Sequence, residues 1–268
     1  MQNHLSNLFI ITSLALLLLS TDLFAELSHE VIPLDTSSHD NLSHDNLSHD
    51  TKADHKSIKA FIAKYDLLKK SDSVGEAIRK LSYSDDNLAN YSYRTEANWF
   101  IFSDIREETS IANLDNKKVT PTHYLFERKG TGRDKKYEWT FDVGNDLATD
   151  LKKAKQLAVD FPEKIQDKLS YQLQLRLDLI QNSSQKEYTY PVISTSGSIK
   201  EYIFENQGEE TLTLPFGEVK AIKLKRDVKD KITYVWFAPE LNYLLVKIYQ
   251  IKNGKGQFNA LLKTVETF

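Results

Sequence analysis

The chain has 268 residues, with 35 Lys and Arg, 38 Asp and Glu, and no Cys. A composition of 40% apolar and 27% charged residues is ordinary for a globular protein and excludes collagen-like repeats or disorder throughout. The absence of Cys excludes disulfides, thiolate metal sites and cysteine nucleophiles. The length allows one large domain or two small ones.

The N-terminus carries a candidate export signal. Residues 8–20 form an apolar run of thirteen residues, whereas a helix needs roughly 20 to span a bilayer. The run fits the hydrophobic centre of a secretory signal peptide, with cleavage after Ala25 removing residues 1–25. An uncleaved membrane anchor is the alternative, because Met1–His4 carry no Lys or Arg and Leu23 is large for its position before the cut. No later stretch is apolar enough to span a membrane.

The segment after the signal, residues 26–56, is acidic and repetitive. Residues 26–55 hold seven acids and one base, a net charge of −6, whereas 56–268 carry 30 acids and 34 bases, a net of +4. The pentapeptide Asn-Leu-Ser-His-Asp occurs at 41–45 and again at 46–50. We interpret 26–56 as a disordered linker, because it is polar and lacks core-forming residues. The basic excess of the body is dispersed, without Arg clusters, so no nucleic-acid partner is expected.

Five of the seven histidines fall in this linker: His29, His39, His44, His49 and His55. Imidazoles and carboxylates are suitable ligands for Zn²⁺, Cu²⁺ or Ni²⁺, so a weak metal-binding arm is the alternative interpretation. A period of five residues separates successive histidines by about 140° on a helix, so no helical face collects them. We therefore predict no metal site and no cofactor.

From residue 57 onward the pattern is that of a single antiparallel β domain, 57–268. Short runs of aromatic and aliphatic residues alternate with turn sequences too short for parallel crossovers. The side chains of Tyr91, Tyr93 and Thr95 are expected to share one face of a strand. Residues 144–159 are expected to be loop or a short helix. The predicted strands are 59–68, 74–84, 88–100, 101–112, 119–129, 136–143, 187–193, 198–207, 208–214, 218–228, 231–238, 244–252 and 257–265.

One stretch has helical periodicity. Apolar residues in 163–181 recur at spacings of three and four, which predicts an amphipathic helix with Asp160 as a candidate N-cap and Pro162 in its first turn. The wide apolar stripe should be covered by the sheet on at least one side. The expected fold class is therefore mainly β, a curved antiparallel sheet or open barrel-like meander with one major helix near 163–181.

The closing block, Tyr234-Val-Trp-Phe-Ala-Pro-Glu-Leu-Asn-Tyr-Leu-Leu-Val-Lys-Ile248, resembles the C-terminal signature of the bacterial family called domain of unknown function 3108. Other blocks agree in order: Val74–Ala77, Asp167–Ser170 and Gly208–Val219. Leu245 departs from the pattern, which usually has Pro there. The resemblance covers 57–268 and implies an exported, largely antiparallel β protein of the Gram-negative cell envelope, placed in the periplasm.

Three sets of residues are candidates for a functional site, and none is assigned a role. Glu209 and Glu210 are adjacent on a strand and therefore point to opposite faces. His123 has no neighbouring nucleophile motif, and the chain has neither a G-x-S-x-G sequence nor a P-loop. Trp236 and Phe237 are expected to be core residues. The sequence therefore predicts no catalytic residue, and leaves the ligand-binding residues unknown.

The predicted function is a non-catalytic binding or envelope-maintenance module for an apolar ligand such as a lipid, a lipoprotein acyl chain or a peptide. This expectation rests on analogy with half-barrel carriers. The alternatives are a structural or protein-interaction module with a filled core, and an unrecognised hydrolase.

Overall fold

The computed structural model describes residues 58–69, 71–84, 88–115 and 117–268. The predicted signal peptide, the linker with its repeat and the five linker histidines lie outside these residues. No helix of the described part is long and apolar enough to cross a membrane.

The described residues form one curved sheet of 14 antiparallel strands, in the order β8-β7-β6-β5-β4-β3-β2-β1-β14-β13-β12-β11-β10-β9. The first meander contains β1 (Phe61–Lys69), β2 (Asp72–Tyr83), β3 (Leu88–Trp99), β4 (Phe102–Leu114), β5 (Val119–Gly130), β6 (Lys135–Asp142), β7 (Leu147–Asp150) and β8 (Lys155–Ala158). The second contains β9 (Glu187–Ile193), β10 (Ile199–Leu214), β11 (Gly217–Val228), β12 (Lys231–Ala238), β13 (Leu244–Lys252) and β14 (Lys255–Thr267).

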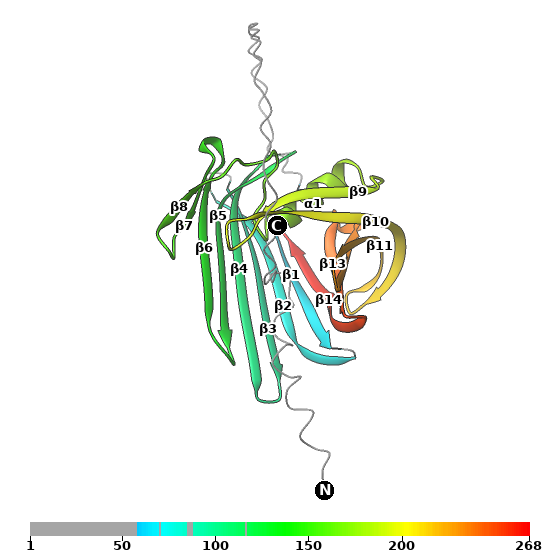
Figure 1. Ribbon diagram of the computed structural model, residues 1–268. Helices are drawn as coiled ribbons and strands as arrows, with labels where there is room; N and C mark the ends of the chain where they lie inside the picture. Colours follow the sequence, from blue (N-terminus) through cyan, green and yellow to red (C-terminus); the bar gives the residue numbers. More distant parts are fainter. Residues whose placement is uncertain (1–57, 70, 85–87, 116) are drawn as a thin grey trace, which may run out of the picture. The chain divides into compact units, whose positions relative to one another are not determined.

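The two meanders join through the first and last strands. Phe61 in β1 pairs with Thr267 in β14, so the two ends of the described chain meet in the middle of the sheet. The outermost strands β8 and β9 remain edges, so the sheet curves without closing. Figure 1 shows β1–β6 as one wall, β9–β14 as the other, and α1 (Tyr171–Gln181) between them. The predicted fold class is confirmed.

The helix is shorter than the periodicity predicts. It begins at Tyr171, because Gln166 joins β9 instead: its N–H donates to the carbonyl of Pro191 and its own carbonyl accepts from Ile193, both at 2.9 Å. Asp167 Oδ1 then accepts the N–H groups of Leu169 and Ser170 at 2.7 Å, a turn that leads into the helix. The predicted capping by Asp160 is therefore wrong.

The helix is enclosed on nearly all sides. Its apolar side chains at 173, 175, 177 and 179 are buried, and so are the polar side chains of Gln172, Gln174 and Arg176. Arg176 Nε donates to the carbonyl of Asn242 at 2.8 Å, just after the short helix η3 (Pro239–Leu241). A helix inside a curved sheet has no solvent-facing side to fill with charges, so its buried polar groups bond to the surrounding strands.

A second difference concerns residues 144–159, predicted as loop or short helix. They form β7 and β8, preceded by the short helix η2 (Val143–Asn145). Ala148 pairs with Phe141 and is fully buried, whereas its neighbours on β7 are only partly covered. The strands have only four residues each, too few for an alternating pattern to show in the sequence. The predicted strands at 198–207 and 208–214 are one strand, β10, with an irregular register between Asn206 and Glu209.

Candidate functional site

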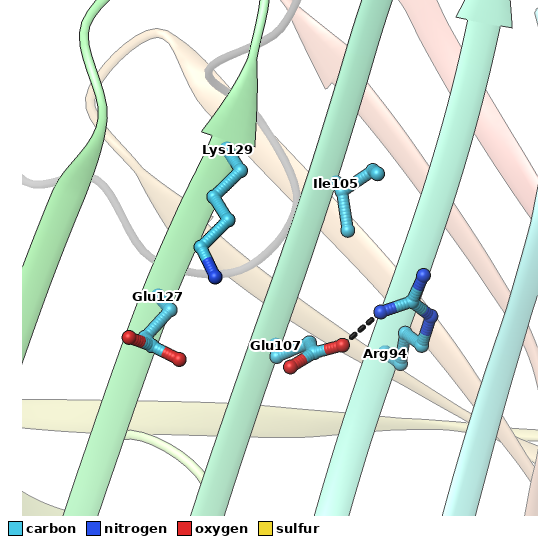
Figure 2. A pocket seen from close by; sticks show the side chains of 5 residues that line it. All are labelled: Arg94, Ile105, Glu107, Glu127 and Lys129. Atoms are coloured by element: carbon cyan, nitrogen blue, oxygen red, sulfur yellow. Dashed lines mark hydrogen bonds and ion pairs between the residues drawn. The ribbon is translucent and has the colours of Figure 1, made fainter.

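A shallow depression of about 130 Å³ lies on the outer face of the sheet, across β3, β4 and β5. Figure 2 shows its lining, Arg94, Ile105, Glu107, Glu127 and Lys129, on three neighbouring strands. Arg94 is paired with Glu107 and, at 3.1 Å, with Glu96. Because its two basic and two acidic side chains balance and its ion pairs face solvent, this depression offers little net attraction to a charged ligand.

The inner face, which carries α1, is chemically different. Arg79 on β2 lies opposite Tyr93 on β3, and Thr95 lies opposite Arg106 on β4. Side chains on the same face of adjacent strands are close neighbours, so these four form one continuous patch. All are buried: Arg79 and Thr95 are 1% exposed, and Tyr93 and Arg106 are 4% exposed. We call these four residues the donor cluster.

Arg79 is held firmly within the donor cluster. Its Nη1 donates to the hydroxyl of Tyr91 at 2.9 Å and to Oε1 of Gln172 on α1. Its guanidinium lies 3.9 Å from the centre of the Tyr93 ring, a cation–π contact. Among the described residues no carboxylate pairs with it. An arginine stays charged even when buried, so the groups in direct contact that offset this positive charge are dipoles and aromatic faces.

Each member of the donor cluster also keeps one polar atom without a hydrogen-bond partner in the described part of the chain. These atoms are Arg79 Nη2, Tyr93 OH, Thr95 Oγ1 and Arg106 Nη2. Leaving a buried donor unpaired costs about 1–3 kcal/mol, and native proteins seldom do so. Four such atoms on one patch are therefore an arrangement suited to binding a ligand rich in acceptor atoms.

Positive charge prevails around the donor cluster. Asp104 is the only carboxylate described in contact with its arginines, and it is shared: Oδ2 accepts from Arg106 Nε at 2.7 Å and Oδ1 from Arg128 Nε at 2.5 Å. Glu108 lies opposite Tyr93, but burial raises the pKa of this carboxyl, although nearby Lys168 opposes the shift. Asp104 is shared by two guanidiniums, and Arg79 has no ion pair among the described residues, so this patch favours an anion.

The polar region continues beneath the start of α1 to the second meander. Burial raises the pKa of Tyr171 to about 12, with Arg226 and Arg79 both acting against that rise, so both cations lie near this hydroxyl. Arg226 Nε on β11 has no hydrogen-bond partner in the described structure, and neither have Nε2 and Oε1 of the fully buried Gln250 on β13. Both meanders therefore contribute unpaired polar atoms.

The candidate residues named from the sequence lie outside the donor cluster. His123 Nε2 is 3.2 Å from Glu138 Oε1, in a partly exposed pair. Glu210 accepts a hydrogen bond from Trp236 Nε1 at 2.6 Å, whereas Glu209 is exposed. Trp236 and Phe237 are buried. Within the described residues no group of three or more His, Asp or Glu side chains is arranged to hold a metal ion.

The donor cluster was missed because no motif marks it. Tyr93 and Thr95 were expected to share a face with Tyr91, and all three side chains are buried. The sequence did contain one indication of the site. Arg79 is charged, yet it lies two residues from Ala77 and from Leu81, on the buried face of the alternating strand β2. A charge at a core position of an alternating strand indicates either a buried pair or a site.

Comparison with known proteins places the fold and the family. The structure is similar to the crystal structure of a beta-barrel-like protein of domain of unknown function DUF1849 from Brucella abortus, at 11% identity and a TM-score of 0.53, covering 79% of this chain and 98% of that one. A protein with a YmcC-like fold from Bacteroides fragilis has the same identity and coverage, at a TM-score of 0.32. No curated protein matches the sequence. The family model of proteins of unknown function DUF3108 matches residues 64–263, and the chain belongs to this family.

Proposed function

We propose that this protein is an exported, non-catalytic binding module of the cell envelope that holds an amphipathic anion against the inner face of its sheet. The acidic head of the ligand bonds to the donor cluster, and its apolar part packs among the neighbouring core side chains. The observation that carries the proposal is the set of four adjacent, buried and unpaired polar atoms on Arg79, Tyr93, Thr95 and Arg106.

The chemistry of these atoms favours a carboxylate or phosphate head. Two guanidiniums supply charged N–H donors, and two hydroxyls can donate alongside them. A neutral, purely apolar ligand would leave all four unpaired, at a cost of about 1–3 kcal/mol each. The ligand class expected from the sequence, apolar molecules, is thus narrowed to apolar molecules with an acidic end.

The apolar part of the proposed ligand would have apolar neighbours on the inner face of the sheet. Tyr65 and Leu67 on β1, Ala77 on β2 and Phe126 on β5 are all buried. Small curved sheets of this kind can hold one small ligand inside. The similarity to the Brucella protein supports the fold alone, so the binding role is argued from the side chains.

Export to the periplasm is supported by the sequence of the leader. Its apolar run of thirteen residues matches a signal peptide in length, and the predicted cut after Ala25 would release the β domain. A non-catalytic role is supported by the surroundings of the donor cluster, where the two nearest carboxylates bond to arginines or to the Tyr124 hydroxyl. The only histidine of the body, His123, is paired with Glu138 instead.

Fluorescent fatty-acid binding tests the proposal. The wild-type protein is titrated with cis-parinaric acid and, separately, with its methyl ester, which has the same chain without the charge. We expect the acid to bind more tightly, and Arg106→Gln to abolish that preference by removing one unpaired donor and one charge. The matched control is Arg94→Gln, on the outer face of β3.

Two results would contradict the proposal. One is equal binding of acid and ester by the wild type, and the other is an Arg106→Gln protein that keeps the preference. Circular dichroism of each variant separates loss of binding from loss of fold. Native mass spectrometry of the purified protein gives an independent readout of bound lipid.

A module with a filled core is the alternative, because α1 is buried on almost every side and occupies the space between the two walls. In that case neither probe binds, native spectra show no lipid, and the partner is a protein. Ligand binding by the wild type in either assay would exclude this alternative.

A further inference from the structure

The hairpin between β3 and β4 ends in an apolar tip. Phe100 is 88% exposed and Ile101 is 86% exposed, the two highest values among the exposed large apolar side chains of the described residues. Figure 1 shows this hairpin reaching beyond its neighbours, β1–β2 and β5–β6, at the same end of the sheet. Two adjacent, fully presented apolar side chains at the end of a long hairpin are unusual in a protein surrounded only by water.

The β3–β4 turn lacks the residues that two-residue hairpin turns normally contain. Trp99 pairs with Phe102, so Phe100 and Ile101 form a two-residue turn. Such turns favour Asn-Gly or Gly at positions of positive φ, yet Phe100 has a φ of 54°. A bulky residue in that region is strained by about 1–2 kcal/mol. A turn that accepts strain in order to display apolar groups indicates an interaction surface.

The end of the β5–β6 hairpin lies beside the tip and is hydrogen-bonded to the start of β4. Thr131 N–H donates to the carbonyl of Ser103 at 2.7 Å, and Ser103 N–H donates to Thr131 Oγ1 at 3.1 Å. The end of the β5–β6 hairpin, residues 129–135, which includes the last residues of β5 and the first of β6, contains three basic residues and one acidic residue. Lys129 and Arg133 are exposed. Cations next to an exposed apolar pair match the surface of an anionic bilayer, where apolar groups meet acyl chains and cations meet phosphates.

We propose that Phe100 and Ile101 insert into the headgroup region of a lipid bilayer, with Lys129 and Arg133 contacting anionic lipid phosphates. This membrane-binding surface is separate from the donor cluster, and membrane binding does not require a ligand at the donor cluster. It would hold this end of the β domain against a membrane.

The absence of Cys allows a position-specific test with the full chain. Ile101→Cys and, as the matched control, Leu151→Cys in the β7–β8 turn are each labelled with the dye NBD. Leu151 is also an exposed apolar residue, at 45%. Vesicles of phosphatidylglycerol and phosphatidylcholine in equal amounts are then added, with some samples containing a doxyl-lipid quencher. The apolar run at 8–20 is present in both proteins, so a difference between the two labels reports the tip.

We expect the label at 101 to shift to the blue and to be quenched by the doxyl lipid, while the label at 151 does neither. In the unlabelled chain, Phe100→Ser with Ile101→Ser should lower vesicle affinity at least about tenfold. Lys129→Glu with Arg133→Glu should weaken binding to anionic vesicles more than to pure phosphatidylcholine. An unshifted label at 101, or equal shifts at 101 and 151, would overturn the proposal.

Discussion

At the scale of single residues, the inner face of the first meander buries charged side chains, which proteins normally expose to solvent. Arg79 is 1% exposed and is stabilised by Tyr91, Gln172 and the ring of Tyr93 rather than by an acid. Burial of an unpaired charge is costly, so its hydrogen bonds and cation–π contact offset only part of the penalty. An anion bound at the donor cluster would lower that penalty and should therefore stabilise the folded protein.

The buried carboxyl of Asp167 should make stability depend on pH. Burial raises its pKa from 3.8 to about 6, although Ser110 donates to it at 2.5 Å. The folded state thus holds a proton that the unfolded chain has lost, so this contribution to stability is present below about pH 4 and disappears as pH rises through about 6. The two pKa values differ by about two pH units, which corresponds to about 3 kcal/mol.

Urea unfolding of Asp167→Asn and wild type at a series of pH values tests this prediction. Asn cannot ionise, so the free energy of unfolding of the variant, relative to wild type, should rise by about 3 kcal/mol between about pH 4 and pH 7. Asp134→Asn, on the exposed β5–β6 turn, is the control. Parallel pH profiles for wild type and Asp167→Asn would contradict the predicted shift.

Gly75 is predicted to be irreplaceable for a steric reason. A Cβ placed there would lie 1.9 Å from the carbonyl oxygen of Glu96 on the neighbouring strand. Gly75→Ala should therefore destabilise the protein by about 3 kcal/mol, because backbone must move to admit the methyl group. Gly144→Ala, whose Cβ would meet nothing closer than 3.8 Å, is the control and should change the midpoint of urea unfolding little. Equal midpoints for the two variants would contradict the clash.

At the scale of elements, the sequence was informative where strands are long and turns are polar. The alternation on β1 to β6 and the polar turns between them, all except the apolar β3–β4 turn, were sufficient to place those strands within a few residues. It failed where tertiary contacts decide. Residues 163–170 have helical spacing, but Gln166 bonds to β9. β7 forms by pairing with β6, and β8 by pairing with β7. Local pattern cannot reveal bonds to a distant strand.

The β3–β4 tip gives a prediction at this scale. Replacing Phe100-Ile101 by Asn-Gly supplies residues that tolerate positive φ and should stabilise the protein by about 1 kcal/mol. The same change should abolish vesicle binding by the tip. The stability of the fold would therefore rise while the affinity for vesicles falls. The measurements are the midpoint of urea unfolding and vesicle co-sedimentation. A destabilised variant would show that the two side chains support the hairpin itself.

At the scale of the whole molecule, the curved sheet was predictable but the donor cluster was not. Alternation and turn spacing are local properties, and they fix antiparallel neighbours. The donor cluster needs Arg79, Tyr93 and Arg106 to meet in a particular register across three strands. A shift of one residue would turn Arg79 to the outer face. Register is decided by the assembled sheet, so the site becomes visible only in the structure.

The open sheet has two edges that should differ in stability. Three of the four residues of β8 are exposed, and the strand pairs only with β7 among the described strands. β9 buries Tyr188, Tyr190 and Val192, and its outer side bonds to Gln166. Tyr190 OH further donates to Asp178 on α1 at 2.8 Å. One edge is therefore attached to the core, and the other is free to separate.

Hydrogen exchange followed by NMR should resolve this difference. Amides of β8 are expected to exchange near the rate of an unfolded chain, whereas those of β9 should be protected about a thousandfold or more. The central strands β1 and β14 serve as the internal reference, since each is paired on both sides. Comparable protection at β8 and β9 would contradict this difference. An unprotected β8 would instead be the place to look for a protein partner, because an open strand is where another chain adds by β-augmentation.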